Sequence, residues 1–219
     1  MSRLLWVAIW VISAGLIMGS TEQGQADRAI TVSGSPERTA LVIGNANYQS
    51  APLQNPVNDA RDMAEKLRTL GFEVIEKVNA GRRAMHTAVE DFYRNLNQSG
   101  VGFFYYAGHG VQIDGSNYLL PVDLQASSAA DIKYKAVRAD WVLAKMEDAQ
   151  SKVNIVVLDA CRDNPFRGIR SADAGLSPLQ SARGSFIAYA TSPGSVAQDG
   201  SGDNGVYTKH LLQNMNRKG

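Results

Sequence analysis

The sequence predicts an α/β fold in which a mostly parallel sheet is covered by helices on both faces. Two observations lead to this prediction. Short apolar runs rich in β-branched or aromatic residues alternate along the chain with helical patterns of ten residues or more. Connections of that length are what parallel strands require. The 219 residues, 44 % of them hydrophobic, indicate one sizeable domain rather than two.

Five strands and four helices are expected in alternation, with a hairpin after the third strand. The strands are expected at residues 38–45, 72–78, 101–108, 153–161 and 185–191. The helices are expected at about 55–71, 81–97, 139–149 and from 206 onward.

The first strand and the first helix carry clear boundary signals. The run RTALVIGN is apolar from Ala40 to Ile43, as a buried strand is. The following helix is expected to begin with the Asn55 side chain as its cap and Pro56 in its first turn. Its apolar stripe ends before Gly71, a residue type that commonly follows the last turn.

The remaining elements follow from the same kinds of pattern. FEVIEKV alternates like a half-buried strand, and the next helix has one apolar face, formed by Met85, Val89, Phe92 and Leu96. The aromatic density of VGFFYYAG suits a central strand. VQIDGSNYLL is expected to form a hairpin that turns at Asp114-Gly115. VNIVVLDAC and SFIAYAT are further apolar strands.

The carboxyl ends of the strands are where binding sites lie in sheets of this kind. The residues at these ends are Asn45, His109, Cys161 and Thr191. His109, in YAGHG, comes directly after the third expected strand, and Cys161 ends the fourth. If these two strands are neighbours, both side chains face one crevice.

His109 and Cys161 have a chemical rationale as a pair. A thiol with a pKa of about 8.5 is only slightly ionised at neutral pH, and an adjacent imidazole can deprotonate it and later protonate a leaving amine. The N–H groups of Gly110 and Cys161 can donate to a developing oxyanion. Taken singly, such a histidine is more often a hydrogen-bonded loop residue, and a lone cysteine is more often core filler. Both alternatives stay open beside the catalytic one.

The two active-site motifs together resemble those of caspases. Caspases carry Gln-Ala-Cys, with a histidine about 50 residues upstream. This chain has Asp159-Ala160-Cys161, and His109 precedes it by a similar interval. With RTALVIGNANY, LQNPVNDARDMAEKLRTLGFEV, FFYYAGHGVQIDGSNYLLPVD and GSFIAYATSPGSVAQDG, the chain looks like a bacterial metacaspase-type member of the caspase-like clan, peptidase C14, from residue 38 to about 216.

This resemblance implies a fold and a set of roles. The fold is a caspase-like three-layer α/β/α sandwich around a six-stranded, mostly parallel sheet. His109 is then the general base and acid of a cysteine-type endopeptidase, and Cys161 is its nucleophile. Gly110 and Cys161 form the oxyanion hole.

The residue at position 159 points to the substrate. Residues two apart on a strand share a side, so the Asp159 carboxylate is expected beside Cys161, where it favours a cation and repels an acid. The resemblance to metacaspases adds Asp59 as a second acid of this pocket. We therefore expect cleavage after Arg or Lys rather than after Asp. The alternative for Asp59 is a solvated charge or a first-turn acid that complements the helix dipole.

The resemblance also raises the questions of self-cleavage and calcium binding. Arg167, Arg170 and Arg183 lie where caspases are cut on maturation, so they are candidate self-cleavage sites. No metal or other cofactor is required, but some metacaspases bind calcium, for which Asp123 and Asp140 are the candidate counterparts. Scattered aspartates are more commonly solvated.

The function classes that remain are few. The formal net charge of +1 argues against nucleic acid or an anionic membrane surface as a partner. Protein or peptide substrates with Arg or Lys before the scissile bond are the expected partners, and the oligomeric state is not predicted. The rival function is a non-catalytic caspase-fold interaction module. A generic thiol hydrolase or redox sensor is disfavoured because one cysteine offers no resolving partner.

The two ends of the chain suggest its domain organisation. Residues 1–26 have the layout of a secretory signal peptide, residues 27–37 form a linker, and the peptidase domain covers 38–219. Export to the periplasm or the exterior is expected, with membrane anchoring by residues 4–21 as the alternative. Members of the family usually continue with another helix and a strand, so we expect the final strand to be absent from this chain. The alternatives are a C-terminally incomplete fragment, a minimal domain of lower stability, and a domain that gains this sheet edge from a partner.

Overall fold

A computed structural model of the 219-residue chain describes residues 37–96, 100–161, 169, 172–173, 176–180, 184–190 and 202–215. All of these belong to one unit of the chain, residues 34–219. The expected signal peptide and the expected linker up to residue 36 lie outside the described residues, as do Arg167, Arg170, Arg183 and Thr191. No helix within the described ranges has the length and apolar character needed to span a membrane.

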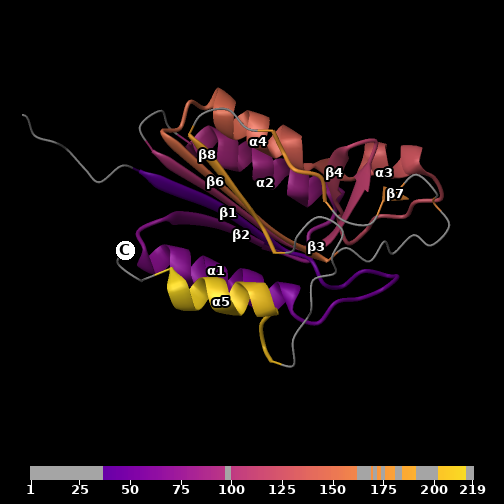
Figure 1. Ribbon diagram of the computed structural model, residues 1–219, viewed down its shortest axis with the longest axis horizontal. Coiled ribbons are helices and arrows are strands. Elements are labelled where there is room, and N and C mark those ends of the chain that lie inside the picture. Colours follow the sequence, from indigo (N-terminus) through magenta and orange to yellow (C-terminus); the bar gives the residue numbers. More distant parts are fainter. Residues whose placement is uncertain are drawn as a thin grey trace, which may run out of the picture. The chain divides into compact units, whose positions relative to one another are not determined.

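Eight strands and five helices make up the described fold (Figure 1). The strands are β1 (Arg38–Gly44), β2 (Glu73–Val78), β3 (Val101–Ile113), β4 (Ser116–Leu119), β5 (Val137–Arg138), β6 (Val153–Cys161), β7 (Ala172–Asp173) and β8 (Ser185–Tyr189). The helices are α1 (Pro56–Thr69), α2 (Arg82–Asn95), α3 (Ala129–Lys135), α4 (Ala139–Asp148) and α5 (Val206–Asn214).

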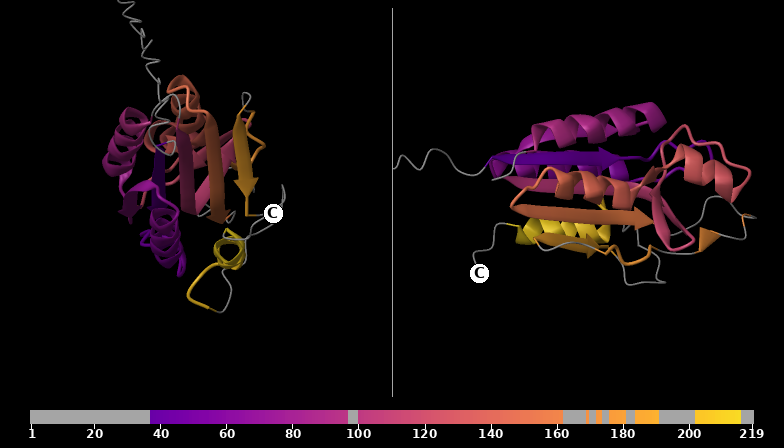
Figure 2. Two further views of the ribbon diagram at one scale, coloured as in Figure 1. Left: turned by 90° about the vertical axis from the view of Figure 1, so that its left-hand side faces the viewer. Right: turned by 90° about the horizontal axis from the view of Figure 1, so that it is seen from above.

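Four parallel pairings join five of the strands into a sheet in the order β2-β1-β3-β6-β8. Helices α1 and α5 cover one face of this sheet, and α2 and α4 cover the other (Figures 1 and 2). The prediction of an α/β/α sandwich with a mostly parallel sheet is therefore confirmed. Among the described strands, β8 pairs only with β6, so it lies at the edge of the described sheet.

Two apolar layers hold the helices on the sheet, and β3 shows how its sequence supplies both. Phe104 and Tyr106 pack into the layer beneath α2 and α4. Phe103, Tyr105 and Ala107 pack into the layer beneath α1 and α5. Successive side chains of a strand point to opposite faces, so an unbroken apolar run is what a central strand covered on both sides needs.

Strand β3 continues past the point where the sequence pattern suggested an end. It runs to Ile113, so the expectation that His109 follows the strand is wrong: His109 lies within it. The strand changes partners along its length, with β6 beside it up to His109 and β4 beside it from Gly110 onward. The turn at Asp114 and Gly115 is confirmed, and both residues have positive φ, as a two-residue hairpin loop requires.

The helix ends differ from the sequence prediction in one respect. Asn55 precedes α1, but its side chain makes no capping hydrogen bond to the helix, so the predicted cap is wrong. Helix α2 is capped by a residue from a distant loop: Asp123 Oδ1 accepts a hydrogen bond of 2.8 Å from the Arg82 N–H in its first turn. Helix α3, which the apolar pattern did not indicate, has a complete capping box formed by Ser128 and Asp131.

Candidate active site

The backbones of His109 and Cys161 lie side by side, where β3 passes the end of the adjacent parallel strand β6. They are the last pair in the ladder between β3 and β6, which begins at Val101 and Val153. Neighbouring strands are about 4.8 Å apart, so the structure brings these two residues together as the sequence predicted. Both predicted participants therefore meet at one point of the sheet.

A backbone carbonyl from another loop fixes which nitrogen of the imidazole carries a proton. His109 Nε2 lies 2.7 Å from the carbonyl oxygen of Ala51, and His109 is only 1 % exposed. Because a carbonyl can only accept, Nε2 must donate, and in the neutral ring Nδ1 then holds the lone pair. Nδ1 is therefore the basic nitrogen of this histidine. Ala51 has a φ of 56°, a conformation that non-glycine residues rarely adopt.

Two tyrosine hydroxyl groups hold the backbone of His109. The His109 N–H donates to Tyr48 Oη at 2.9 Å, and the Tyr106 hydroxyl donates to the His109 carbonyl at 2.7 Å. The Tyr48 ring also packs on the imidazole, with ring centroids 4.5 Å apart. The Leu120 carbonyl lies within 3.1 Å of both hydroxyl oxygens. These contacts fix the position of His109, and sequence reasoning did not identify either tyrosine.

Gly108 has no side chain, which leaves room for these two hydroxyl groups. A Cβ atom at this position would lie 2.7 Å from Tyr48 Oη and 2.8 Å from Tyr106 Oη, closer than carbon and oxygen can approach. Its φ of 152° is also outside the usual range for residues with a side chain. The glycine before His109 is therefore required by its surroundings.

Asn45, also at a strand end, has a structural role in the described fold. It is fully buried, and its amide nitrogen donates to the carbonyl of Leu120 at 3.0 Å. Its amide oxygen accepts from the Ala80 N–H at 2.8 Å. Asn45 thus ties the end of β1 to the loops that follow β2 and β4.

Gly110 presents its N–H on the side of the strand that faces β6. The Leu120 N–H donates to the His109 carbonyl at 3.0 Å, so His109 bonds toward β4. Backbone groups of successive residues in a strand point to opposite sides, so the Gly110 N–H points away from β4. A Cβ at Gly110 would lie 3.1 Å from the Ala160 Cβ, which leaves little room for a side chain.

The carboxylates of Asp59 and Asp159 converge on the start of α5. A Cβ built on Gly205 would lie 3.1 Å from Asp59 Oδ2 and 3.7 Å from Asp159 Oδ2, and the Gly205 N–H donates to Asp59 Oδ1 at 3.0 Å. Asp59 is 3 % exposed and Asp159 is 9 % exposed. The alternative that Asp59 is a solvated charge is therefore wrong. The residue does lie in the first turn of α1.

The burial of Asp59 beside a second acid changes its ionisation. Burial, followed by the charge of Asp159, raises the pKa of Asp59 from 3.8 to about 7, while the Gly205 N–H and the Asn204 side chain act in the opposite direction. Burial and the same two carboxylates also raise the pKa of Tyr105 well above 10. Near neutral pH, Asp59 therefore exists in both protonation states, and a cation placed beside it would favour the ionised form.

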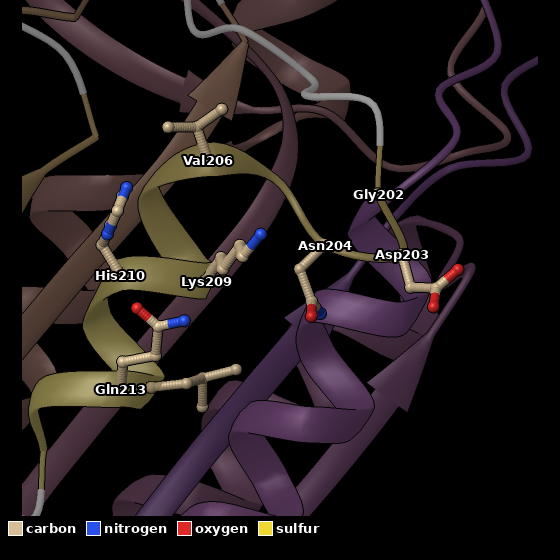
Figure 3. Close-up of a pocket in the computed structure, with 8 residues that line it drawn as sticks. Gly202, Asp203, Asn204, Val206, Lys209, His210 and Gln213 are labelled. Atoms are coloured by element: carbon tan, nitrogen blue, oxygen red, sulfur yellow. The ribbon is translucent and has the colours of Figure 1, made fainter.

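A hollow of about 630 Å³ borders the opposite side of the α5 start (Figure 3). Lys209, His210 and Gln213 lie along the outward face of α5, and the Asn204 side chain donates to Asp62 Oδ2 at 2.7 Å. Gly205 and Thr208 are buried against the acids instead. The described residues that line this hollow include neither His109 and Cys161 nor the two acids, so the hollow is separate from the predicted site. A smaller hollow of about 240 Å³ borders Tyr48, the residue that packs on His109.

The described residues contain no group of three or more His, Cys, Asp or Glu that could hold a metal ion. Asp123 accepts the hydrogen bond that caps α2, and Asp140 pairs with the Arg138 guanidinium, whose Nε lies 2.9 Å from Asp140 Oδ1. Each proposed calcium counterpart thus has a structural partner of its own. Calcium binding stays a prediction.

An α/β/α sandwich with a histidine in β3 beside a cysteine at the end of β6 defines a broad class of protein, and the sequence comparison identifies the family within that class. Residues 37–219 match the Peptidase C14 family, described as the caspase domain. The chain therefore belongs to the caspase domain family, and the suspected resemblance is confirmed.

Relatives of known name extend this comparison. The chain is 28 % identical over 183 residues to the human "Mucosa-associated lymphoid tissue lymphoma translocation protein 1", a match that covers 82 % of this chain and 22 % of that protein. It is 26 % identical over 216 residues to a "Probable protease" of a Desulfuromonadales bacterium, with 82 % of this chain and 26 % of that protein covered. The chain thus spans about a quarter of the length of these relatives.

Proposed function

We propose that this domain is a cysteine-type endopeptidase that cleaves protein or peptide chains after Arg or Lys. The observation that carries the proposal is the convergence of two buried carboxylates, Asp59 and Asp159, beside the strand end that bears Cys161. Membership of a peptidase family supports the reaction class. The name of the bacterial relative, a probable protease, agrees with it.

The proposed reaction uses His109 as both base and acid. Nδ1 of His109 takes the proton of the Cys161 thiol, and the thiolate attacks the scissile carbonyl carbon. The N–H groups of Gly110 and Cys161 donate to the resulting oxyanion. His109 then protonates the leaving amine as the C–N bond breaks, which leaves a thioester. Water, deprotonated by His109, attacks this thioester and releases the carboxylate product and the thiol.

The proposed specificity rests on charge. Two carboxylates held in a site of low exposure bind a cation more strongly than they would in water, because fewer solvent dipoles compete. A substrate guanidinium or ammonium group would drive the remaining proton off Asp59. A substrate aspartate would meet like charge instead, which disfavours the specificity of caspases that cleave after acidic residues.

Localisation and context belong to the same proposal. We propose an exported domain, with the segment before residue 27 as its signal and anchoring by residues 4–21 as the alternative. Because the chain spans only part of its relatives, the proposal concerns the activity of this domain.

The test compares four peptides that differ only in the residue before a fluorogenic bond: Arg, Lys, citrulline and Asp. Citrulline has the shape of arginine without its charge. We expect the wild-type chain to cleave the Arg and Lys peptides, with and without added calcium, and the Cys161→Ala variant to cleave none. Faster cleavage of the Asp or citrulline peptide would contradict the charge argument. No cleavage by a folded chain would favour the non-catalytic interaction module.

A further inference from the structure

A buried hydroxyl group contacts the Asp159 carboxylate, and a second hydroxyl group contacts the first. Thr208, on α5, donates from Oγ1 to Asp159 Oδ2 at 2.6 Å. The hydroxyl oxygen of Tyr105, on β3, lies 2.5 Å from the same Thr208 Oγ1. Both Thr208 and Tyr105 are 0 % exposed. Three elements, β3, α5 and β6, are thus joined by two consecutive hydrogen bonds.

The chemistry of these groups fixes the direction of the hydrogen bonds. An ionised carboxylate can only accept, so Thr208 must donate its single hydroxyl proton to Asp159. The Thr208 oxygen then accepts from Tyr105, whose raised pKa keeps its proton in place. The sequence of donors runs from Tyr105 through Thr208 to Asp159. A hydrogen bond to a charged acceptor is among the strongest in proteins, which makes this contact suited to holding the carboxylate in one orientation.

The same turn of α5 contacts the other acid. The Gly205 N–H donates to Asp59 Oδ1, and Gly205 and Thr208 are three residues apart, which places them on the same side of a helix. One face of the α5 start therefore contacts both carboxylates, through a backbone donor at Asp59 and a side-chain donor at Asp159. The positive end of the helix dipole also points toward the pair.

We propose that Thr208, oriented by Tyr105, is a positioning residue for substrate specificity: it holds the Asp159 carboxylate where the cationic side chain of the substrate binds. This inference rests on the proposed function, which assigns Asp159 to that side chain. Thr208 itself does not touch the reacting atoms. Its effect is expected on the preference for a charged substrate and not on the chemical step.

Three variants separate the hydroxyl group from the packing around it. Thr208→Val keeps the shape and removes the donor, Thr208→Ser restores a donor, and Tyr105→Phe removes only the group that orients Thr208. The matched control is Thr39→Val, which removes another buried threonine hydroxyl, one that donates to the Asn95 carbonyl at the opposite end of the strands. Thermal unfolding of each variant checks that the fold is retained.

The kinetic measurement is the ratio of kcat/KM for the Arg peptide to that for the citrulline peptide. Thr208→Val should lower this ratio about tenfold, the effect of losing one hydrogen bond to a charged group. The loss should appear as a higher KM for the Arg peptide at nearly unchanged kcat. Thr208→Ser should restore most of the ratio, Tyr105→Phe should lower it to a smaller extent, and Thr39→Val should leave it unchanged.

A binding measurement separates this inference from the proposed peptidase activity. Calorimetry on the catalytically disabled Cys161→Ala chain gives the affinities for arginine amide and citrulline amide, with and without Thr208→Val. Tighter binding of arginine amide that weakens in Thr208→Val supports the inference, even if the wild-type chain cleaves nothing. An equal loss for both amides, or a fall in kcat alone while the wild-type chain cleaves after Arg, would overturn the role of Thr208 and leave the peptidase function intact.

Discussion

At the scale of single residues, Asp59 carries the clearest consequence of burial. Its side chain is buried beside Asp159, and it accepts a hydrogen bond from the Gly205 N–H at the start of α5. The folded chain therefore holds the Asp59 proton more tightly than the unfolded chain does, since the pKa rises from 3.8 to about 7 on folding. Ionised Asp59 is thus a cost to stability while no cation is bound beside it.

The pH dependence of stability follows with a definite sign. The contribution of Asp59 to folding is most favourable below pH 3.8 and is lost as the pH rises through about 7. The Asp59→Asn variant should therefore be more stable than the wild type by about 4 kcal/mol at pH 8 and by only about 2 kcal/mol at pH 5. Urea unfolding at the two pH values measures this. Equal differences at both would mean that Asp59 does not hold a proton in the folded chain.

Gly108 gives a second prediction at the residue scale. Gly108→Ala places a methyl group against the Tyr48 and Tyr106 hydroxyls, so we expect a loss of stability of about 3 kcal/mol or more and loss of activity. The matched control is Gly115→Ala, where φ is also positive but no atom lies within 4 Å. That change should cost only about 1 kcal/mol, the strain of the backbone. Similar losses in the two variants would contradict the account of Gly108.

At the scale of elements, the sequence predicted the long strands and helices well and their junctions poorly. Apolar periodicity identifies β1, β6, α1 and α2 because each buries one face or both faces in the core. The continuation of β3 through Gly108-His109-Gly110 was missed because glycines usually indicate a turn. Here they allow the Tyr48 hydroxyl and the Ala160 side chain of β6 to come close to the strand.

The candidate site was predictable to a similar degree. Strand-end positions indicated His109 and Cys161, and the alternation of strand residues indicated Asp159. The partners that orient these groups could not be predicted. Ala51 is 58 positions away from His109, and Thr208 is 49 positions away from Asp159, so only folding brings each pair together. No local pattern encodes such contacts.

The start of α2 provides a prediction at the element scale. Asp123→Ala removes the carboxylate that caps the Arg82 N–H, so the chain should lose about 1 kcal/mol of stability. The loss should be the same in calcium and in EDTA, since a cap needs no metal. A wild-type chain that calcium stabilises, and an Asp123→Ala chain that it does not, would assign Asp123 to a calcium site instead.

At the scale of the whole molecule, the sheet brings parts that are distant in the sequence to one end of β3 and β6. The loop after β1 contributes Tyr48 and Ala51, and α1 contributes Asp59. Gly205, just before α5, and Thr208, within it, complete the set. The parallel order β1-β3-β6 makes this possible, because β1 and β6 end at the same edge of the sheet and β3 extends past them there.

The most direct test of the central claim is mass spectrometry of the chain after reaction with peptidyl chloromethyl ketones that carry Arg or Asp next to the reactive carbon. We expect the Arg reagent to add one group to Cys161, the reaction to be lost in His109→Ala, and the Asp reagent to react far more slowly. Equal labelling by both reagents, or labelling of Cys161 that does not depend on His109, would contradict an Arg/Lys-directed cysteine-histidine peptidase.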